Sequence, residues 1–310
     1  MSQLEKFETA PIPPANRLAF WNDLVDQIYS GTFVNADEPD FLATMWRWNV
    51  GQLEMIRPRS QRSHVGRMPD ARVTEERVVL HLQRRGTSRH CQWMRETDLH
   101  PGDFVLCSAN HPYAMDLQTS HELLVVEFPR TLIAGRVQGL DDRFARRVSG
   151  ASPSGRLFHD FLLSLWHQGD QSDADPEWQS GVSSVFADLV ALAVNGSGVA
   201  REVEPGGALR RKLLSLIEAR IGDPELRTAT IAQELRISER TVQNLFTAMA
   251  TTPSAYILER RLSRGAEILT SNPEASITAV AFDLGFNDSA YFARCFRQRF
   301  GTTPRAWRGH

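Results

Sequence analysis

The stretch ITAVAFDLGFNDSAYFARCFRQRFGTTP, residues 277–304, has a counterpart in IAQELRISERTVQNLFTAMATTP, residues 231–253. Both copies run in the same order: a short helix with a small residue at its centre, a tight turn, an N-cap, a second helix and Thr-Thr-Pro. The small residues, Ala232 and Ala281, stand where the two helices of a helix-turn-helix cross closely. The sequence therefore predicts two such units.

The residues at the helix ends agree with this prediction. Ser238 and Asp288 can accept hydrogen bonds from the free N–H groups that open the next helix. Gly285 suits the left-handed position that ends a helix. Thr252 before Pro253 is a further N-cap, with proline at the first helical position.

The second helix of each copy has one apolar and one polar face, and the polar face predicts DNA recognition. Arg, Gln and Asn side chains can form bidentate hydrogen bonds with base edges in the major groove. We expect base contacts from Arg240, Gln243, Asn244, Ser289 and Arg294. Ala290 and Ala293 on the second helix could only meet a thymine methyl group.

A helix over residues 254–269 would hold the two units about 24 Å apart, close to the roughly 34 Å between successive major grooves. Phosphate contacts are expected from arginines outside the base-reading positions. These are Arg210, Arg260, Arg264, Arg297, Arg299 and Arg305.

Charge divides the chain at the same place as composition. The 310 residues carry a net charge of −2, but residues 1–204 hold 20 Arg and Lys against 27 Asp and Glu, and residues 205–310 hold 15 against 10. Turn formers without apolar periodicity fill residues 196–207, which are expected to be a linker between domains at 1–195 and 208–310. An acidic domain is thus predicted to precede a basic one.

The N-terminal part combines helices with short strands. Residues 15–29 have the period of an amphipathic helix, and several short β-type runs separated by turn residues follow between 41 and 128, which favours an antiparallel barrel or sandwich. Helical periodicity returns at 157–166 and 178–194, where an antiparallel hairpin is expected. The broad apolar faces of this hairpin predict a homodimer.

Residues 209–308 resemble the DNA-binding domain of AraC/XylS-type transcription regulators. The resemblance is carried by Arg261-Leu262-x3-Ala266-x2-Leu269, then Ile277-x2-Val280-Ala281-x3-Gly285-Phe286-x4-Tyr291-Phe292-x-Arg294-x-Phe296-x3-Phe300-Gly301-x2-Pro304. It implies a domain whose third and sixth helices read adjacent major grooves, with the base-reading residues at the positions given above.

The N-terminal part resembles the ligand-binding module of the same family through Leu99-x-Pro101-Gly102-Asp103-x-Val105-Leu106-Cys107-Ser108 and Pro112-Tyr113. The resemblance implies a cupin-like antiparallel β-barrel with dimerising helices. The expected fold is thus an α+β chain of two domains, the second an all-α double helix-turn-helix domain. Modules of this kind often respond to small aromatic or organic-acid effectors.

An effector pocket should be concave and mostly apolar, with a few polar anchors. Strand alternation and aromatic content give six candidates: Trp46, Trp48, His81, Trp93, His111 and Tyr113. Each of them can equally be ordinary core. An effector carboxylate could pair with Arg57, Arg59, Arg62, Arg67 or Arg72, and the sequence does not rank these five.

Other classes of protein lack support in the sequence. There is no apolar run long enough for a membrane helix and no export signal, so we expect a cytoplasmic protein with no membrane partner. The histidines show neither HxH nor HExxH spacing, and phosphate-binding and nucleophile motifs are missing, so no metal, cofactor or catalytic residue is expected.

The sequence favours a DNA-binding transcription activator whose partners are double-stranded DNA, a small effector, RNA polymerase and a second copy of the chain. Two alternatives remain open at this point. One is a regulator without a small ligand, whose barrel only dimerises or binds a protein. The other is a cupin-type enzyme fused to a DNA-binding tail.

Overall fold

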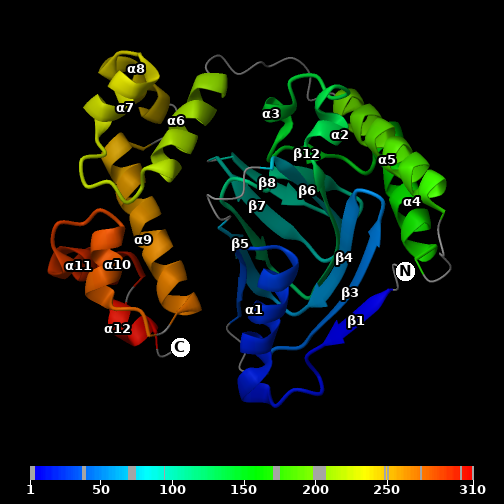
Figure 1. Cartoon of the computed structure of the whole chain (residues 1–310), viewed down its shortest axis with the longest axis horizontal. Coiled ribbons are helices and arrows are strands. Elements are labelled where there is room, and N and C mark those ends of the chain that lie inside the picture. Colours follow the sequence, from blue (N-terminus) through cyan, green and yellow to red (C-terminus); the bar gives the residue numbers. More distant parts are fainter. Residues whose placement is uncertain are drawn as a thin grey trace. The chain divides into compact units, whose positions relative to one another are not determined.

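The computed structural model describes residues 4–36, 40–68, 75–93, 95–169, 175–197, 207–247, 249, 251–272, 274–300 and 302–308. Its contacts divide the chain into two compact units, residues 1–203 and 204–310 (Figure 1). Most of the expected linker and Arg72 lie outside the described residues. The domain limits at 195 and 208 therefore stay a prediction.

The N-terminal unit contains two antiparallel sheets. Within the described residues, the first sheet has seven strands in the spatial order β1 (Glu5–Glu8), β3 (Ala43–Val50), β4 (Leu53–Ser60), β11 (His121–Pro129), β6 (Arg77–Arg85), β9 (Phe104–Ser108) and β12 (Arg147–Val148). The second sheet has five strands there, in the order β2 (Thr32–Asn35), β5 (Ser63–Arg67), β10 (Tyr113–Leu117), β7 (Ser88–Gln92) and β8 (Arg95–Leu99). The predicted antiparallel domain is confirmed, as two open sheets rather than one closed barrel.

The central strands of the first sheet are apolar on both faces. In β6, Val78, Leu80 and Leu82 belong to one buried cluster, while Val79 between them belongs to another. β9 and β11 alternate in the same way. Because successive side chains of a strand point to opposite faces, this sheet is the middle layer between two separate cores.

Helices close the outer core. α4 (Pro153–His167) and α5 (Pro176–Gly196) pack on each other beside the first sheet (Figure 1). The ring centroids of Phe158 of α4 and Phe104 of β9 are 4.9 Å apart. Those of Phe186 of α5 and Phe128 of β11 are 5.1 Å apart. The short helices α2 (Thr131–Ala134) and α3 (Leu140–Arg143) add Ile133 and Leu140 to this core.

The inner core lies between the sheets. α1 (Arg17–Ile28), preceded by the 3-10 turn η1 (Pro14–Asn16), contributes Trp21, Leu24 and Val25 to it. The expected helix at 15–29 and the expected hairpin are therefore both present. Among the described residues, the strands β3 to β11 fall in the stretch at 41–128 where short β-type runs were expected, with β11 ending one residue beyond it.

The C-terminal unit is helical throughout its described residues. Its elements are α6 (Gly207–Ala219), α7 (Thr228–Leu235), α8 (Glu239–Thr247), α9 (Pro253–Ser271), α10 (Ile277–Asp283), α11 (Ser289–Phe300) and α12 (Pro304–Trp307). α9 packs against members of both repeats. The ring centroid of its Tyr256 lies 5.5 Å from that of Phe246 of α8. The indole Nε1 of Trp307, on α12, donates to the carbonyl of Ala266 of α9 at 3.3 Å. The two repeats therefore share one central helix.

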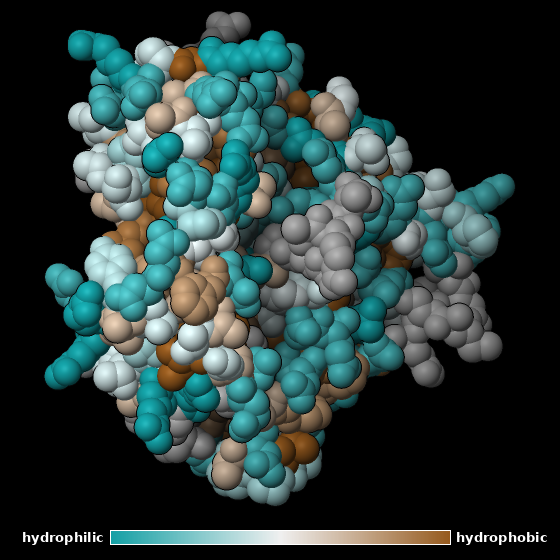
Figure 2. Space-filling model, turned by 60° about the vertical axis from the view of Figure 1, so that its left-hand side comes forward, coloured by the Kyte–Doolittle hydropathy of each residue, from teal (hydrophilic) through white to brown (hydrophobic). Residues whose placement is uncertain are grey.

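The surface is mainly polar. Figure 2 shows one face on which hydrophilic residues predominate and hydrophobic residues appear in small patches. Among the described residues, seven large apolar side chains are exposed, and four of them lie on α4 and α5. These four are Leu157, Trp178, Val185 and Leu192.

The N-caps of the second repeat are formed as expected and can be tested. Asp288 accepts hydrogen bonds from the N–H groups of Ala290 at 2.9 Å and Tyr291 at 3.2 Å. Asp288→Ala should lower the free energy of unfolding of the C-terminal unit by about 1 kcal/mol, since these two donors lose their acceptor. Urea denaturation followed by circular dichroism measures this, with the exposed Asn287→Ala as control; equal stability of the two variants would contradict the cap.

Candidate nucleic-acid interface and effector cavity

The two turns of the helix-turn-helix units are built alike. The N–H of Ile237 donates to the Ala232 carbonyl at 3.0 Å, and the N–H of Phe286 donates to the Ala281 carbonyl at the same distance. Each turn includes a residue with positive φ, Arg236 in the first and Gly285 in the second. An alanine at 285 would place its Cβ 2.6 Å from the Arg261 guanidinium and 3.0 Å from the Gly222 carbonyl, so glycine is needed there.

The recognition helices bury their apolar faces and expose the predicted base-reading residues. Val242 and Phe246 of α8, and Phe292 and Phe296 of α11, are fully buried. Arg240, Gln243, Asn244 and Arg294 are exposed, and Ser289 is half-buried at the start of α11. The Arg294 guanidinium lies 5.8 Å from the centre of the Tyr291 ring. All five residues thus lie on the two predicted recognition helices, and their contacts with bases stay a prediction.

The predicted phosphate contacts differ in their surroundings. Arg297 and Arg305 are exposed, whereas Arg210 and Arg264 are half-buried. Arg299 pairs with Glu259 of α9 at 2.8 Å. Arg260 of α9 pairs with Glu218 of α6 at 2.5 Å, so this guanidinium joins two helices of the domain.

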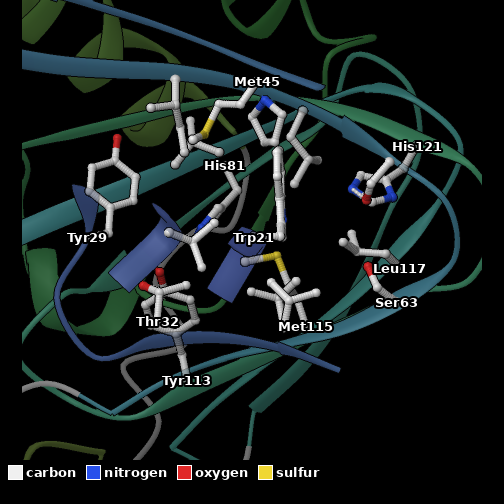
Figure 3. Close-up of a pocket in the computed structure, with 18 residues that line it drawn as sticks. Trp21, Tyr29, Thr32, Met45, Ser63, His81, Tyr113, Met115, Leu117 and His121 are labelled. Carbon is white, nitrogen blue, oxygen red and sulfur yellow. Dashed lines mark hydrogen bonds between the residues drawn. The ribbon is translucent and has the colours of Figure 1, made fainter. Parts of the chain in front are cut away.

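A cavity of about 60 Å³ lies between the two sheets of the N-terminal unit. It is bounded by α1 and by strands of both sheets (Figure 3). Most of the lining is apolar, as with Val25, Met45, Ile56, Leu117 and Val125. The labelled polar groups in its wall are Tyr29, Thr32, Ser63, His81, Tyr113 and His121.

The structure brings together two of the six predicted pocket residues. His81 and Tyr113 line the cavity, with 5.3 Å between their ring centroids. Trp48 is buried in the outer core, where its ring lies 6.4 Å from that of Trp166. Trp46 lies beneath the Arg57 guanidinium.

The remaining two predicted residues, Trp93 and His111, contact each other with ring centroids 5.1 Å apart and do not line the cavity. Trp21 and Val25 of α1 and Tyr29, which directly follows this helix, do line it and were missed. The apolar stripe of residues 15–29 was visible in the sequence, but which core it covers was not.

The four of the five arginines considered for an effector carboxylate that the structure describes are engaged or exposed. Arg67 is buried and binds Glu127 through Nη1 at 2.5 Å, and Glu127 also accepts from Arg77 at 2.9 Å. Arg57 pairs with the buried Glu122 at 2.7 Å. Arg59 and Arg62 are exposed.

Burial also governs the titratable groups in the cavity wall. It lowers the pKa of His81 well below its usual value, with further lowering by His90 and Arg67. It lowers the pKa of His121 to about 4 and raises that of Tyr113. The wall therefore presents neutral imidazole and phenol groups near pH 7.

Comparison with known proteins identifies the family. The profile of AraC-binding-like domains matches residues 21–194, and that of a helix-turn-helix domain matches residues 231–310. The chain belongs to the AraC family. It is a DNA-binding transcription regulator of this family. None of the helices in its described parts is long and apolar enough to cross a membrane.

Individual relatives agree with the assignment. The AraC-family chain is 26% identical over 303 residues to the transcriptional activator NphR of Rhodococcus sp., covering 93% of this chain and 88% of that one. It is 28% identical over 174 residues to the activator RhaS of Escherichia coli, covering 54% and 62%. The crystal structure of the AraC-like activator CuxR has the same fold, with a TM-score of 0.54 and 19% identity, covering 84% of this chain and 94% of that one.

The depressed pKa of His121 makes stability depend on pH. The pKa of His121 is about 4 in the folded protein and roughly 6.5 in the unfolded chain. The contribution of this neutral imidazole to the free energy of unfolding is therefore complete above pH 6.5 and is lost as pH falls toward 4. His121→Gln should reduce the slope of unfolding free energy between pH 6.5 and 5 by about 1 kcal/mol per pH unit.

Urea denaturation followed by tryptophan fluorescence measures this slope, because six of the seven tryptophans lie in the N-terminal unit. His167→Gln, which removes an exposed histidine of α4, is the matched control. Identical slopes in the parent and the His121→Gln variant would contradict the assignment.

Proposed function

We propose that this regulator is a transcription activator that binds its operator through both helix-turn-helix units and is controlled by a small molecule in the cavity of the N-terminal unit. The observation that carries the proposal is the pair of equivalent recognition helices, each with a buried apolar face and an exposed polar one. The activator role is supported by the names of the relatives NphR and RhaS. Activation requires RNA polymerase as a further partner, in the cytoplasm.

Base reading is assigned to Arg240, Gln243 and Asn244 of α8 and to Ser289 and Arg294 of α11. The exposed Arg297 and Arg305 are the strongest phosphate-binding candidates, followed by Arg210 and Arg264. Arg260 and Arg299 act mainly within the domain, because Glu218 and Glu259 hold their guanidinium groups. Even so, the exposed Arg299 can add positive potential toward DNA.

The chemistry of the cavity favours a small, uncharged aromatic effector over an organic acid. Its lining is mainly apolar, and Arg67, a buried arginine nearby, already binds Glu127. Tyr113 and His81 supply polar groups that can orient a hydroxyl or amine. A cavity of about 60 Å³ is small, so the effector must displace part of the wall to enter.

α1 is the wall best placed to move, because it is a helix at the edge of the cavity that lines it through Trp21 and Val25, with Tyr29 directly after it. The phenol of Tyr29 donates to the Glu54 carbonyl of β4 at 3.0 Å. Movement of α1 would therefore act on the first sheet, whose other face packs on α4 and α5. Effector could change DNA binding only through its different affinity for the two arrangements.

A second copy of the chain is assigned to the outer face of α4 and α5. Trp178, Val185 and Leu192 are seven residues apart and exposed, so they form one apolar stripe along α5. Leu157 of α4 adds to it. Pairing two chains there would also raise DNA affinity, because each C-terminal unit carries a modest net charge.

Base reading and phosphate binding are separated by two substitutions. Arg240→Ala should weaken binding to the cognate operator by about 1 to 3 kcal/mol while changing binding to random DNA little, because a bidentate contact to a base is lost. Arg305→Ala should weaken both by similar factors and reduce the salt dependence.

Fluorescence anisotropy with operator and scrambled duplexes at several salt concentrations measures both effects in the full-length protein. An equal loss on operator and scrambled DNA for Arg240→Ala would remove it from the base-reading set. If both variants bind operator and scrambled DNA as tightly as the parent does, α8 and α12 are not part of the DNA interface.

The effector assignment is tested by thermal unfolding of the full-length protein with small aromatics and carboxylates. A ligand at 100 times its Kd adds about 2.7 kcal/mol of stability, and uncharged aromatics should be the stabilising class. Val125→Phe, which fills the cavity, should abolish this shift, whereas the exposed Ala151→Phe should preserve it. If no compound in a broad set stabilises the protein, the alternative of a regulator without a small ligand is favoured.

A further inference from the structure

Three side chains from three strands meet in the layer between the sheets. They are His81 of β6, His90 of β7 and Cys107 of β9, each at most 1% exposed. One ligand atom of each lies within 4.8 Å of the others. Atoms bound to one metal ion at about 2.0 to 2.3 Å lie about 3.3 to 4 Å apart, so side-chain shifts of about 1 Å would close this set on an ion.

The strand register explains why the three side chains converge. His81 pairs with Val105 across β6 and β9, which makes Cys107 its diagonal neighbour on the same face. His90 belongs to the second sheet and approaches from the other side, with its ring centroid 5.1 Å from that of His81. The sequence could not show this site, because the ligands come from strands that carry no shared motif.

Hydrogen bonds fix the tautomer of His90. The amide of Gln83 donates to the Arg85 carbonyl at 2.7 Å, which turns its oxygen toward Ser88. The Ser88 hydroxyl donates to that oxygen at 2.6 Å and can therefore only accept from Nε2 of His90, 2.9 Å away. Because Nε2 carries the proton, Nδ1 presents a lone pair.

This lone pair has no hydrogen-bond partner among the described residues, and the same holds for the buried Nδ1 of His81. Buried ring nitrogens without a partner are unfavourable, since they lose their contacts with water. Ser88 resembles the groups that commonly orient metal-binding histidines through their second ring nitrogen. Both features are expected of a metal site.

Charge selects the ion. Arg67 and Arg77 are already engaged by Glu127, Glu54 and Glu75, so none of these carboxylates is a ligand in the cluster. Two neutral imidazoles and one thiolate exactly offset a monovalent cation, whereas a divalent ion would leave a net charge in a dry interior. A thiolate and imidazoles suit a soft ion.

We propose that His81, His90 and Cys107 bind one Cu(I) ion. On binding, the Cys107 thiol gives up its proton to solvent and its sulfur bonds to the metal, with no change in oxidation state. Met115 lies opposite His90 in the pairing of β10 with β7, so its thioether is on the same face and can serve as a weak further ligand. Figure 3 shows Met115 and His81 in the same cavity wall. Because His81 and Met115 also line the cavity proposed for the organic effector, a bound ion would share part of that wall, and all of its ligands belong to the N-terminal unit.

The test uses the full-length protein, titrated anaerobically with Cu(I) in competition with a Cu(I)-specific chelator. One ion per chain is expected, and an equal amount of Zn(II) should not displace it. X-ray absorption of the loaded wild-type protein should show sulfur and two imidazole nitrogens around copper. Weak binding outside the chelator's range, displacement by Zn(II), or coordination without sulfur would each overturn the proposal.

Variants locate the site. Cys107→Ser should lose the high-affinity ion, while Cys91→Ser, the adjacent residue on β7 after His90, should retain it. Ser88→Ala should weaken binding about 10- to 100-fold, because His90 loses the acceptor that holds its tautomer. Unchanged affinity in Ser88→Ala and Cys107→Ser, or its loss in Cys91→Ser, would overturn the assignment. The wild-type spectrum decides the question even if a core variant fails to fold.

Discussion

The structure of the N-terminal unit depends on a sheet that buries both of its faces. β6, β9 and β11 carry buried apolar side chains on both faces, so each strand contributes to two cores at once. One face needs α4 and α5, and the other needs the second sheet and α1. A strand register shifted by one residue would exchange the two sets of side chains, which strongly specifies the pairing. The cavity and the cluster of His81, His90 and Cys107 both lie on the inner face.

This layering gives a physical route between the cavity and the helices. A ligand that changes the inner core acts on strands whose alternate residues contact α4 and α5 directly. Phe104 and Cys107, on the same strand, lie in the outer and inner cores respectively. No long chain of contacts between the cavity and the helices is needed, since the sheet between them is a single layer. The size of the shift is set by the difference in the ligand's affinity for the two arrangements.

The double helix-turn-helix was predictable because its determinants are local. Ala232, Ala281, Gly285 and the N-cap Asp288 each act within a few residues of sequence, and the structure places them as expected. The pocket was much less predictable. Trp48 and Trp93 have the aromatic character of ligand-binding residues, yet they pack in other parts of the unit. Which face of a strand borders a cavity depends on the partner sheet, and a single sequence contains no record of that pairing.

The central helix α9 has a mechanical consequence for the DNA. Its 19 residues span about 28 Å and pack against both repeats through Tyr256 and Ala266. The recognition helices therefore keep a fixed separation, and successive major grooves of straight B-form DNA lie about 34 Å apart. A duplex bound by both helices at once, as proposed, must present its grooves at the separation that the protein fixes. Operators with easily deformed steps between the two contacted grooves would then be preferred, even though no side chain touches those base pairs.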